Sequence, residues 1–128
     1  MNNTILIVFL VLLFALLVLR LYGACMMKKR EGFQGADGKE LVIVKANWCG
    51  HCKNAMPEFK KLVSSSPIKL QDGSTVVVKI LDEKENSGEV EALQVRGFPT
   101  ILYFNNGQRY EYGGDRSYNG VITFLNSL

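Results

Sequence analysis

The chain begins with an uninterrupted run of 15 apolar residues from Ile5 to Leu19. As a helix this run is about 22 Å long, which is shorter than a ~30 Å hydrocarbon core. If the charged end of Arg20 reaches the lipid headgroups, the apolar span extends to Met27 and to about 34 Å. The pattern therefore predicts one transmembrane helix within residues 1–27, with residues 5–27 in the membrane.

A cleaved signal peptide is the alternative interpretation of this run, since its length also suits the hydrophobic core of such a peptide. Signal peptides begin with basic residues and end in a small-x-small cleavage site. Residues 1–4 contain no basic side chain, and no clear cleavage site precedes the basic cluster Lys28-Lys29-Arg30. We therefore favour an uncleaved single-pass anchor. The positive-inside rule then places residues 28–128 on the cytoplasmic side.

The remaining sequence divides into a polar stretch and an alternation of short apolar runs with helical periodicity. Residues 28–38 contain three glycines and are typical of a tether. Strands are predicted over residues 41–44, 76–81, 100–104 and 108–112. Helices are predicted over residues 48–65, 87–95 and around 121–125. A hairpin turn at Asn105-Asn106-Gly107 joins the last two strands. This order predicts an α/β domain over residues 39–128, with a mixed four-stranded sheet and helices on both faces.

Charge and cysteine content exclude several functions. Residues 39–128 contain 11 basic and 10 acidic side chains, so the basic surface that nucleic-acid binding requires is missing. The three cysteines, Cys25, Cys49 and Cys52, are too few for a disulfide-rich scaffold. With His51 as the single histidine, they also do not make a structural zinc site. No metal is therefore expected.

Candidate chemistry is concentrated in Trp48-Cys49-Gly50-His51-Cys52, between a predicted strand and a predicted helix. Cysteines at this spacing lie about one helical turn apart, so their sulfur atoms can meet. Cys49 is placed at the helix N-terminus, where free backbone N–H groups and the helix dipole favour a thiolate, whereas Cys52 lies deeper. The asymmetry predicts Cys49 as an exposed nucleophile and Cys52 as the thiol that resolves its mixed disulfides. His51 beside the thiolate favours the reduced form.

Residues 48–53, with Pro57 five residues beyond Cys52, are similar to the active-site helix of the thioredoxin family, and Gly50-His51 resembles protein disulfide isomerase in particular. The segment Val95-Arg96-Gly97-Phe98-Pro99-Thr100 resembles the family's loop with a cis-proline opposite the disulfide. Residues 112–125 resemble its last strand and helix. The resemblance implies a thioredoxin-like fold, a redox-active Cys49–Cys52 disulfide without another cofactor, and substrate binding by Trp48, Phe98 and Pro99.

Two features depart from the family's pattern. The family usually has a buried Asp or Glu six residues before the first cysteine, and this position is Ile43 here. Proton transfer at Cys52 is then left to water, Lys45 or another group. The family's first strand and helix need about 30 residues before the central strand, and here only the Gly-containing tether is available for them. The resemblance therefore implies a minimal fold of four strands and three helices. Arg116 stands where isomerase domains carry an arginine that can swing toward the active site, so Arg116 and Lys45 are candidate modulators of the thiol pKa.

Together these features predict a membrane-anchored thiol-disulfide oxidoreductase that acts on protein thiols and disulfides. The alternative is a non-enzymatic membrane or virion component that uses the fold as an interaction module, and Ile43 favours it. Two features disagree on the compartment, because the flanking charges favour a cytoplasmic domain while Gly50-His51 suits an oxidising lumen. A virion membrane is a third candidate, since large DNA viruses also encode small anchored domains of this type. The sequence carries no signal for an oligomeric state.

Overall fold

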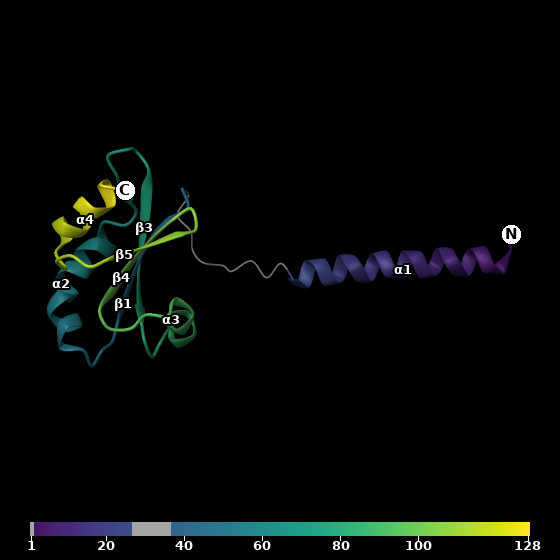
Figure 1. The fold of residues 1–128 in the computed structure, drawn as a ribbon, viewed down its shortest axis with the longest axis horizontal. Coiled ribbons are helices and arrows are strands. Elements are labelled where there is room, and N and C mark those ends of the chain that lie inside the picture. The colour runs from purple at the N-terminus through teal and green to yellow at the C-terminus, as the bar shows by residue number, and fades with distance from the viewer. Residues whose placement is uncertain (1, 27–36) are drawn as a thin grey trace. The chain divides into compact units, whose positions relative to one another are not determined.

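The computed structural model describes residues 2–26 and 37–128, which belong to two separate units (Figure 1). The first contains α1 (Asn3–Met26), a helix of 24 residues. At about 36 Å it is long enough to cross a ~30 Å hydrocarbon core. Its window Asn3–Leu21 has a mean hydropathy of 3.0, and a helix of this composition suits either a membrane span or a signal sequence. The predicted helix is confirmed, and its insertion stays a prediction. Most of the predicted tether lies outside the described residues.

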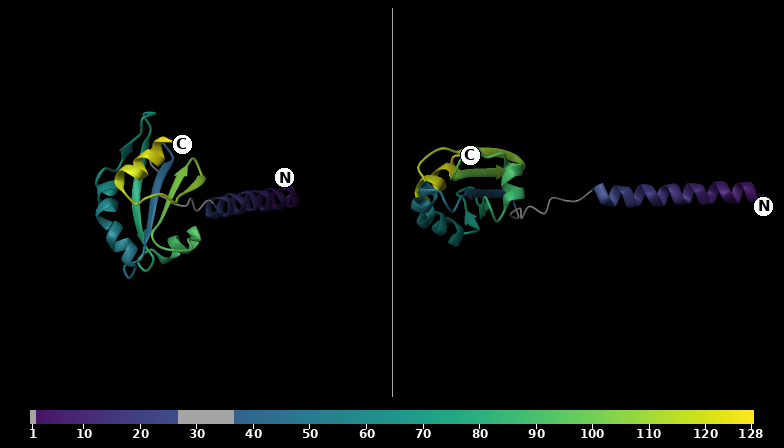
Figure 2. Two further views of the ribbon diagram at one scale, coloured as in Figure 1. Left: turned by 60° about the vertical axis from the view of Figure 1, so that its left-hand side comes forward. Right: turned by 90° about the horizontal axis from the view of Figure 1, so that it is seen from below.

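The second unit is an α/β structure around one mixed sheet (Figure 2). Its elements are β1 (Lys39–Lys45), α2 (Gly50–Ser64), β2 (Ile68–Lys69), β3 (Thr75–Asp82), α3 (Ser87–Leu93), β4 (Thr100–Asn105), β5 (Gln108–Tyr112) and α4 (Tyr118–Asn126). The strands lie in the order β2-β3-β1-β4-β5. The central strand β1 runs parallel to β3 and antiparallel to β4. The predicted crossover from β1 through α2 to β3 is therefore confirmed.

Successive residues of β1 pack on opposite faces of the sheet, which explains their continuous apolar run. Leu41 and Ile43 join a core cluster with residues of α2 and α4. Val42 and Val44 join a second cluster with Val90 of α3. Figure 1 shows α2 and α4 on one side of the sheet and α3 on the other. The prediction of helices on both faces is confirmed.

The sheet has five strands, so the predicted number of four is wrong. The additional strand β2 has two residues and pairs antiparallel with β3, where Ile68 lies opposite Val76. The Ile68 side chain is buried and belongs to the core on the α2 side. Two residues are too few to show the alternation of apolar and polar positions that identifies a strand, so the pattern gave no signal here.

The predicted hairpin between β4 and β5 is confirmed. Asn106 and Gly107 have φ angles of 51° and 87°. Two successive residues with positive φ form the turn type that matches the twist of a two-stranded hairpin. Asn tolerates this conformation better than most residues, and Gly adopts it without steric cost. The turn therefore forms where the sequence supplies these two residues.

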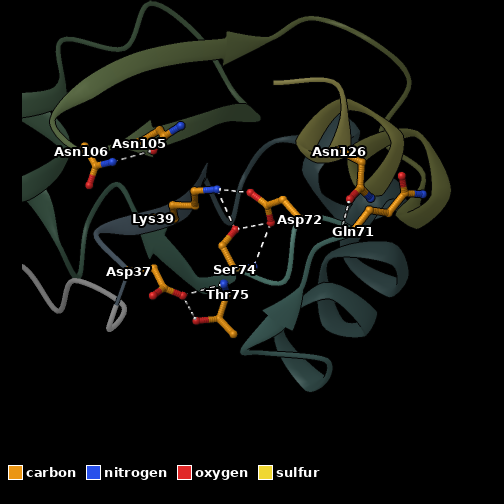
Figure 3. Close-up of polar contacts among 9 residues, drawn as sticks. All are labelled: Asp37, Lys39, Gln71, Asp72, Ser74, Thr75, Asn105, Asn106 and Asn126. Atoms are coloured by element: carbon orange, nitrogen blue, oxygen red, sulfur yellow. Dashed lines mark hydrogen bonds and ion pairs between the residues drawn. The ribbon is translucent and has the colours of Figure 1, made fainter.

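A cluster of polar contacts fixes the chain at the start of β1 (Figure 3). Asp37 accepts hydrogen bonds from the backbone N–H and the hydroxyl of Thr75, at 2.8 and 2.7 Å. Lys39 Nζ donates to Asp72 at 2.9 Å and to Ser74 at 2.6 Å. Hydrogen bonds from Ser74 and Lys39 hold the pKa of Asp72 well below its usual range. These contacts tie the first described residues of the unit to the loop between β2 and β3 and to the start of β3.

Candidate active site

The two cysteines of the motif lie at the N-terminus of α2. A turn leads from the end of β1 into the helix, and the Cys49 N–H donates to the Ala46 carbonyl across it at 3.1 Å. Cys49 is the N-cap residue, with an extended backbone at φ −81° and ψ 119°. Its carbonyl accepts the first helical hydrogen bond from the Lys53 N–H at 3.1 Å. This geometry leaves the N–H groups of the first turn free of helical carbonyl partners and close to the Cys49 sulfur.

The two thiols have opposite pKa shifts. A hydrogen bond from the Cys52 backbone N–H, with further ones from the Cys52 thiol and the His51 N–H, lowers the pKa of the Cys49 thiol. Burial raises the pKa of the Cys52 thiol, and its hydrogen bond to Cys49 raises it further. The hydrogen bonds at Cys49 stabilise its thiolate, whereas burial of Cys52 removes water that would stabilise a thiolate there. Cys49 is therefore the thiol that ionises first.

Cys49 is less accessible than the sequence predicted. Its exposed fraction is 7%, against 1% for Cys52. Phe98 packs against the cluster formed by Ala46 and the two cysteines. The Cys49 thiol donates to the Phe98 carbonyl, with a sulfur–oxygen distance of 3.4 Å. The prediction of an exposed Cys49 is thus wrong, because the loop before β4 covers its sulfur, although Cys49 remains the more accessible of the two thiols.

The predicted substrate-binding residues gather around the Cys49 sulfur. The peptide bond between Phe98 and Pro99 is cis, as the resemblance implied. Trp48 is 63% exposed, and its ring meets that of Phe98 edge-on, with 5.9 Å between the ring centroids. The Trp48 indole N–H donates to the carboxylate of Glu83. An exposed aromatic surface, held by a hydrogen bond, therefore borders the Cys49 thiol.

Gly50, His51 and Arg116 are exposed residues of the same region. Gly50 and His51 belong to the first turn of α2. Arg116 lies in the loop between β5 and α4, and its positive charge lowers the pKa of both cysteine thiols. The fold thus brings Arg116 within electrostatic reach of both sulfur atoms from a segment more than 60 residues along the chain.

Lys45 borders a cavity beside Cys52. The cavity has a volume of about 230 Å³ and is lined by Lys45, Ala46, Asn47, Cys52, Lys53 and Met56. The Lys45 ammonium donates to Asp82 and to Asn47, each at 2.7 Å. The ion pair is largely withdrawn from solvent, with exposed side-chain fractions of 15% for Lys45 and 3% for Asp82. The structure therefore places a largely covered ion pair at the cavity that Cys52 borders.

Sequence analysis missed Asp82 and Glu83, the partners of Lys45 and Trp48. Asp82 is the last residue of β3, and Glu83 follows it directly. The signal that identifies them is register, because β1 and β3 are parallel and Lys45 lies opposite Asp82. Residues at the carboxyl ends of neighbouring parallel strands share one edge of the sheet. This edge is where the motif begins.

Ile43 occupies the position of the family's usual acid. It is fully buried, opposite Ile80 of β3 and Ile101 of β4. An aliphatic side chain therefore stands at the position where the resemblance implied a carboxyl group. The residue that departs from the family's sequence pattern is therefore a buried residue of the core.

The chain is similar to known proteins. The family model described as Thioredoxin matches residues 29–127. Protein disulfide isomerase-like 1-1 of Arabidopsis thaliana is 39% identical over 92 residues, which cover 67% of this chain and 18% of that protein. Protein disulfide-isomerase 1 of Caenorhabditis elegans is 33% identical over 91 residues, covering 70% and 18%. The chain thus spans about a fifth of the length of these curated relatives.

A solved structure with the same fold is the first thioredoxin domain of mouse Protein disulfide-isomerase A4. It superimposes with a TM-score of 0.58 at 28% sequence identity, over 72% of this chain and 63% of that domain. Since the family model covers most of the chain, and the paired cysteines and the cis-proline loop meet at the N-terminus of α2, the chain belongs to the thioredoxin family.

Proposed function

We propose that the chain is a thiol-disulfide oxidoreductase that forms, reduces or isomerises protein disulfides through Cys49 and Cys52. The observation that carries the proposal is the pair of cysteines at the N-terminus of α2 beside the cis-proline loop, where the pKa is lowered at Cys49 and raised at Cys52. A nucleophile must be a thiolate at working pH, whereas a resolving thiol should stay protonated until a mixed disulfide has formed. The relatives named as protein disulfide isomerases support the same activity.

In the reducing direction, the Cys49 thiolate attacks one sulfur of a substrate disulfide. A Cys49–substrate disulfide forms, and the second substrate sulfur leaves as a thiolate. Cys52, once deprotonated, attacks the Cys49 sulfur, closes the Cys49–Cys52 disulfide and releases the first substrate sulfur. The cysteine pair loses two electrons and the substrate disulfide gains two. Oxidation of a substrate dithiol runs through the same bonds in reverse.

The surrounding residues have distinct proposed roles. Trp48, Phe98 and Pro99 bind an extended segment of the substrate protein beside Cys49. Gly50 lets that segment approach the helix, because the space around its Cα is open. Exposed His51 favours the reduced pair and so makes the disulfide a stronger oxidant.

Covalent capture tests the proposed activity. A Cys52→Ala variant of the full chain in detergent micelles is expected to accumulate mixed disulfides with a disulfide-bonded peptide, because the resolving thiol is gone. Mass spectrometry measures the adduct on Cys49. The matched control, Cys49→Ala/Cys52→Ala, should form none. The alternative of a non-enzymatic interaction module, favoured by buried Ile43, predicts the same binding by both variants and no covalent adduct.

We also propose that α1 anchors the chain in a membrane as a single pass. Its length and apolar composition support this role. The full chain is expected to remain in the membrane pellet after alkaline extraction. A variant with Leu10, Leu13 and Leu17 replaced by lysine should be released, since each charge near a helix centre disfavours insertion by about 3 kcal/mol. Release of the parent chain would contradict the anchor. Protease added to sealed vesicles then reports which side carries residues 39–128.

A further inference from the structure

The ion pair of Lys45 and Asp82 lies two residues along β1 and β3 from the pair of Ile43 and Ile80. In the ladder between β1 and β3, Ile43 is opposite Ile80, and Lys45 is opposite Asp82. Residues two apart on a strand face the same side of the sheet and are about 6.6 Å apart. The charged pair is therefore on the α2 side, displaced from Ile43 toward the end of β1 that leads into the cysteine motif.

The Lys45 ammonium is held in a defined position. It donates to Asp82 and to Asn47, each at 2.7 Å. Asp82 is itself fixed by the backbone N–H groups of Lys84 and Glu85, at 3.0 and 3.4 Å. The hydrogen bond from Lys45, followed by that from Lys84, lowers the pKa of Asp82. Asp82 therefore stays ionised at neutral pH, where it is a poor proton acceptor but a strong partner for Lys45.

Lys45 and Cys52 border the same cavity. Its lining residues include Lys45 and Cys52 but not Asp82. Its volume of about 230 Å³ is large enough for several water molecules, each of which takes roughly 30 Å³ in the liquid. Cys52 is almost fully buried, and the cavity is open space that it borders. Cys52 and Lys45 thus border the same cavity, whereas Asp82 does not line it.

Cys49 and Arg116 are the titratable groups that shift the pKa of Cys52. Cys49, on the same helix, raises the pKa of Cys52, and Arg116, from the loop before α4, lowers it. Lys53 lines the cavity from α2. Arg116 and Lys53 are exposed, so water and salt screen their charges, whereas Lys45 is largely covered. Of the three cations, Lys45 is therefore the one least screened by solvent.

We propose that Lys45, positioned by Asp82, promotes ionisation of Cys52 in the resolving step, and that the cavity carries the released proton to solvent. The inference rests on the proposed function. The Cys52 S–H bond breaks and its proton passes to water or buffer in the cavity. The Cys52 thiolate then attacks the Cys49 sulfur, and the substrate sulfur leaves as a thiolate that solvent protonates. Lys45 supplies charge and keeps its own protons.

The test follows closure of the Cys49–Cys52 disulfide in the reduced full chain after mixing with oxidised glutathione. Acid quenching and mass spectrometry separate the glutathione mixed disulfide from the closed form. Lys45→Met is expected to slow closure about tenfold at pH 7, since removing a nearby opposite charge raises the pKa of a thiol. The midpoint of the pH–rate profile should move upward, and the rates of the two proteins should converge at alkaline pH. Lys45→Arg should behave as the parent.

Two variants separate this role from a loss of folding. Lys79 is also partly buried and pairs with buried Glu40 at 3.2 Å, so Lys79→Met leaves an equivalent unpaired acid but should not alter closure. Lys45→Met/Asp82→Asn removes the unpaired acid and should close as slowly as Lys45→Met. A pH–rate profile of that folded double variant identical to the parent's overturns the inference. A parent chain that forms no mixed disulfide would instead contradict the proposed function.

Discussion

A Cys49→Ser variant of the full chain is expected to lose catalysed disulfide exchange by about a thousandfold or more, because covalent catalysis requires the thiolate. The hydroxyl of serine cannot form the mixed disulfide. The backbone N–H groups that lower the pKa of Cys49 remain but have no thiolate to stabilise. Reduction of a disulfide-bonded peptide, followed by mass spectrometry, measures the loss.

Alkylation of the same proteins checks the assignment of the two thiols. At pH 6–7 iodoacetamide should label Cys49 of the parent before Cys52, because a thiol with a lowered pKa holds the larger thiolate fraction. In Cys49→Ser this early labelling should disappear. Cys25→Ser is the control and should retain both early labelling and exchange. Preferential labelling of Cys52 in the parent would reverse the assigned roles.

The second large effect is expected for Phe59→Ala, in the middle of α2. Phe59 is fully buried in the core cluster between α2 and the sheet, together with Leu41 and Leu62. Truncation of a buried Phe leaves a cavity and costs about 3–5 kcal/mol. This is a large share of the ~5–15 kcal/mol that typically stabilises a domain. Guanidinium unfolding of the full chain in micelles, followed by tryptophan fluorescence, measures the change in free energy of unfolding.

The neighbouring residue provides the control for that experiment. Lys60 is exposed on the same helix, so Lys60→Ala should change the free energy of unfolding by less than about 0.5 kcal/mol. A loss below about 1 kcal/mol in Phe59→Ala would mean that α2 is not held by this contact. The packing of α2 positions both cysteines, so the variant should also lose exchange activity at denaturant concentrations that the parent tolerates.

Long elements of the fold were predictable from sequence, whereas the shortest was not. The apolar run of β1 and the helical spacing of Cys52, Phe59 and Leu62 each extend over enough residues to show a period. The turn at Asn106 and Gly107 was predictable from two residues because these types tolerate positive φ. The strand β2 exists because Ile68 pairs with Val76 of β3. The residues next to Ile68 in the sequence give no pattern that indicates this pairing.

The site divides in the same way between local and long-range features. The opposite pKa shifts of Cys49 and Cys52 follow mainly from the helix N-terminus and from burial, so the motif predicted them. The Phe98 carbonyl that covers Cys49 comes from 49 residues away, and Asp82 reaches Lys45 across 37 residues. Such contacts depend on strand register and loop path, which the spacing of a motif does not contain.

The polar cluster at the start of β1 determines where a mechanical load on the chain is borne. A force applied through the residues before Asp37 runs along β1, whose seven residues extend for about 23 Å toward the cysteine motif. The bonds of Asp37 to Thr75 and of Lys39 to Asp72 and Ser74 receive this force first. The ladders to β3 and β4 resist it in shear, since their hydrogen bonds lie across its direction and must break together. We therefore expect tension on the N-terminal segment to load these bonds and ladders before the cysteine motif.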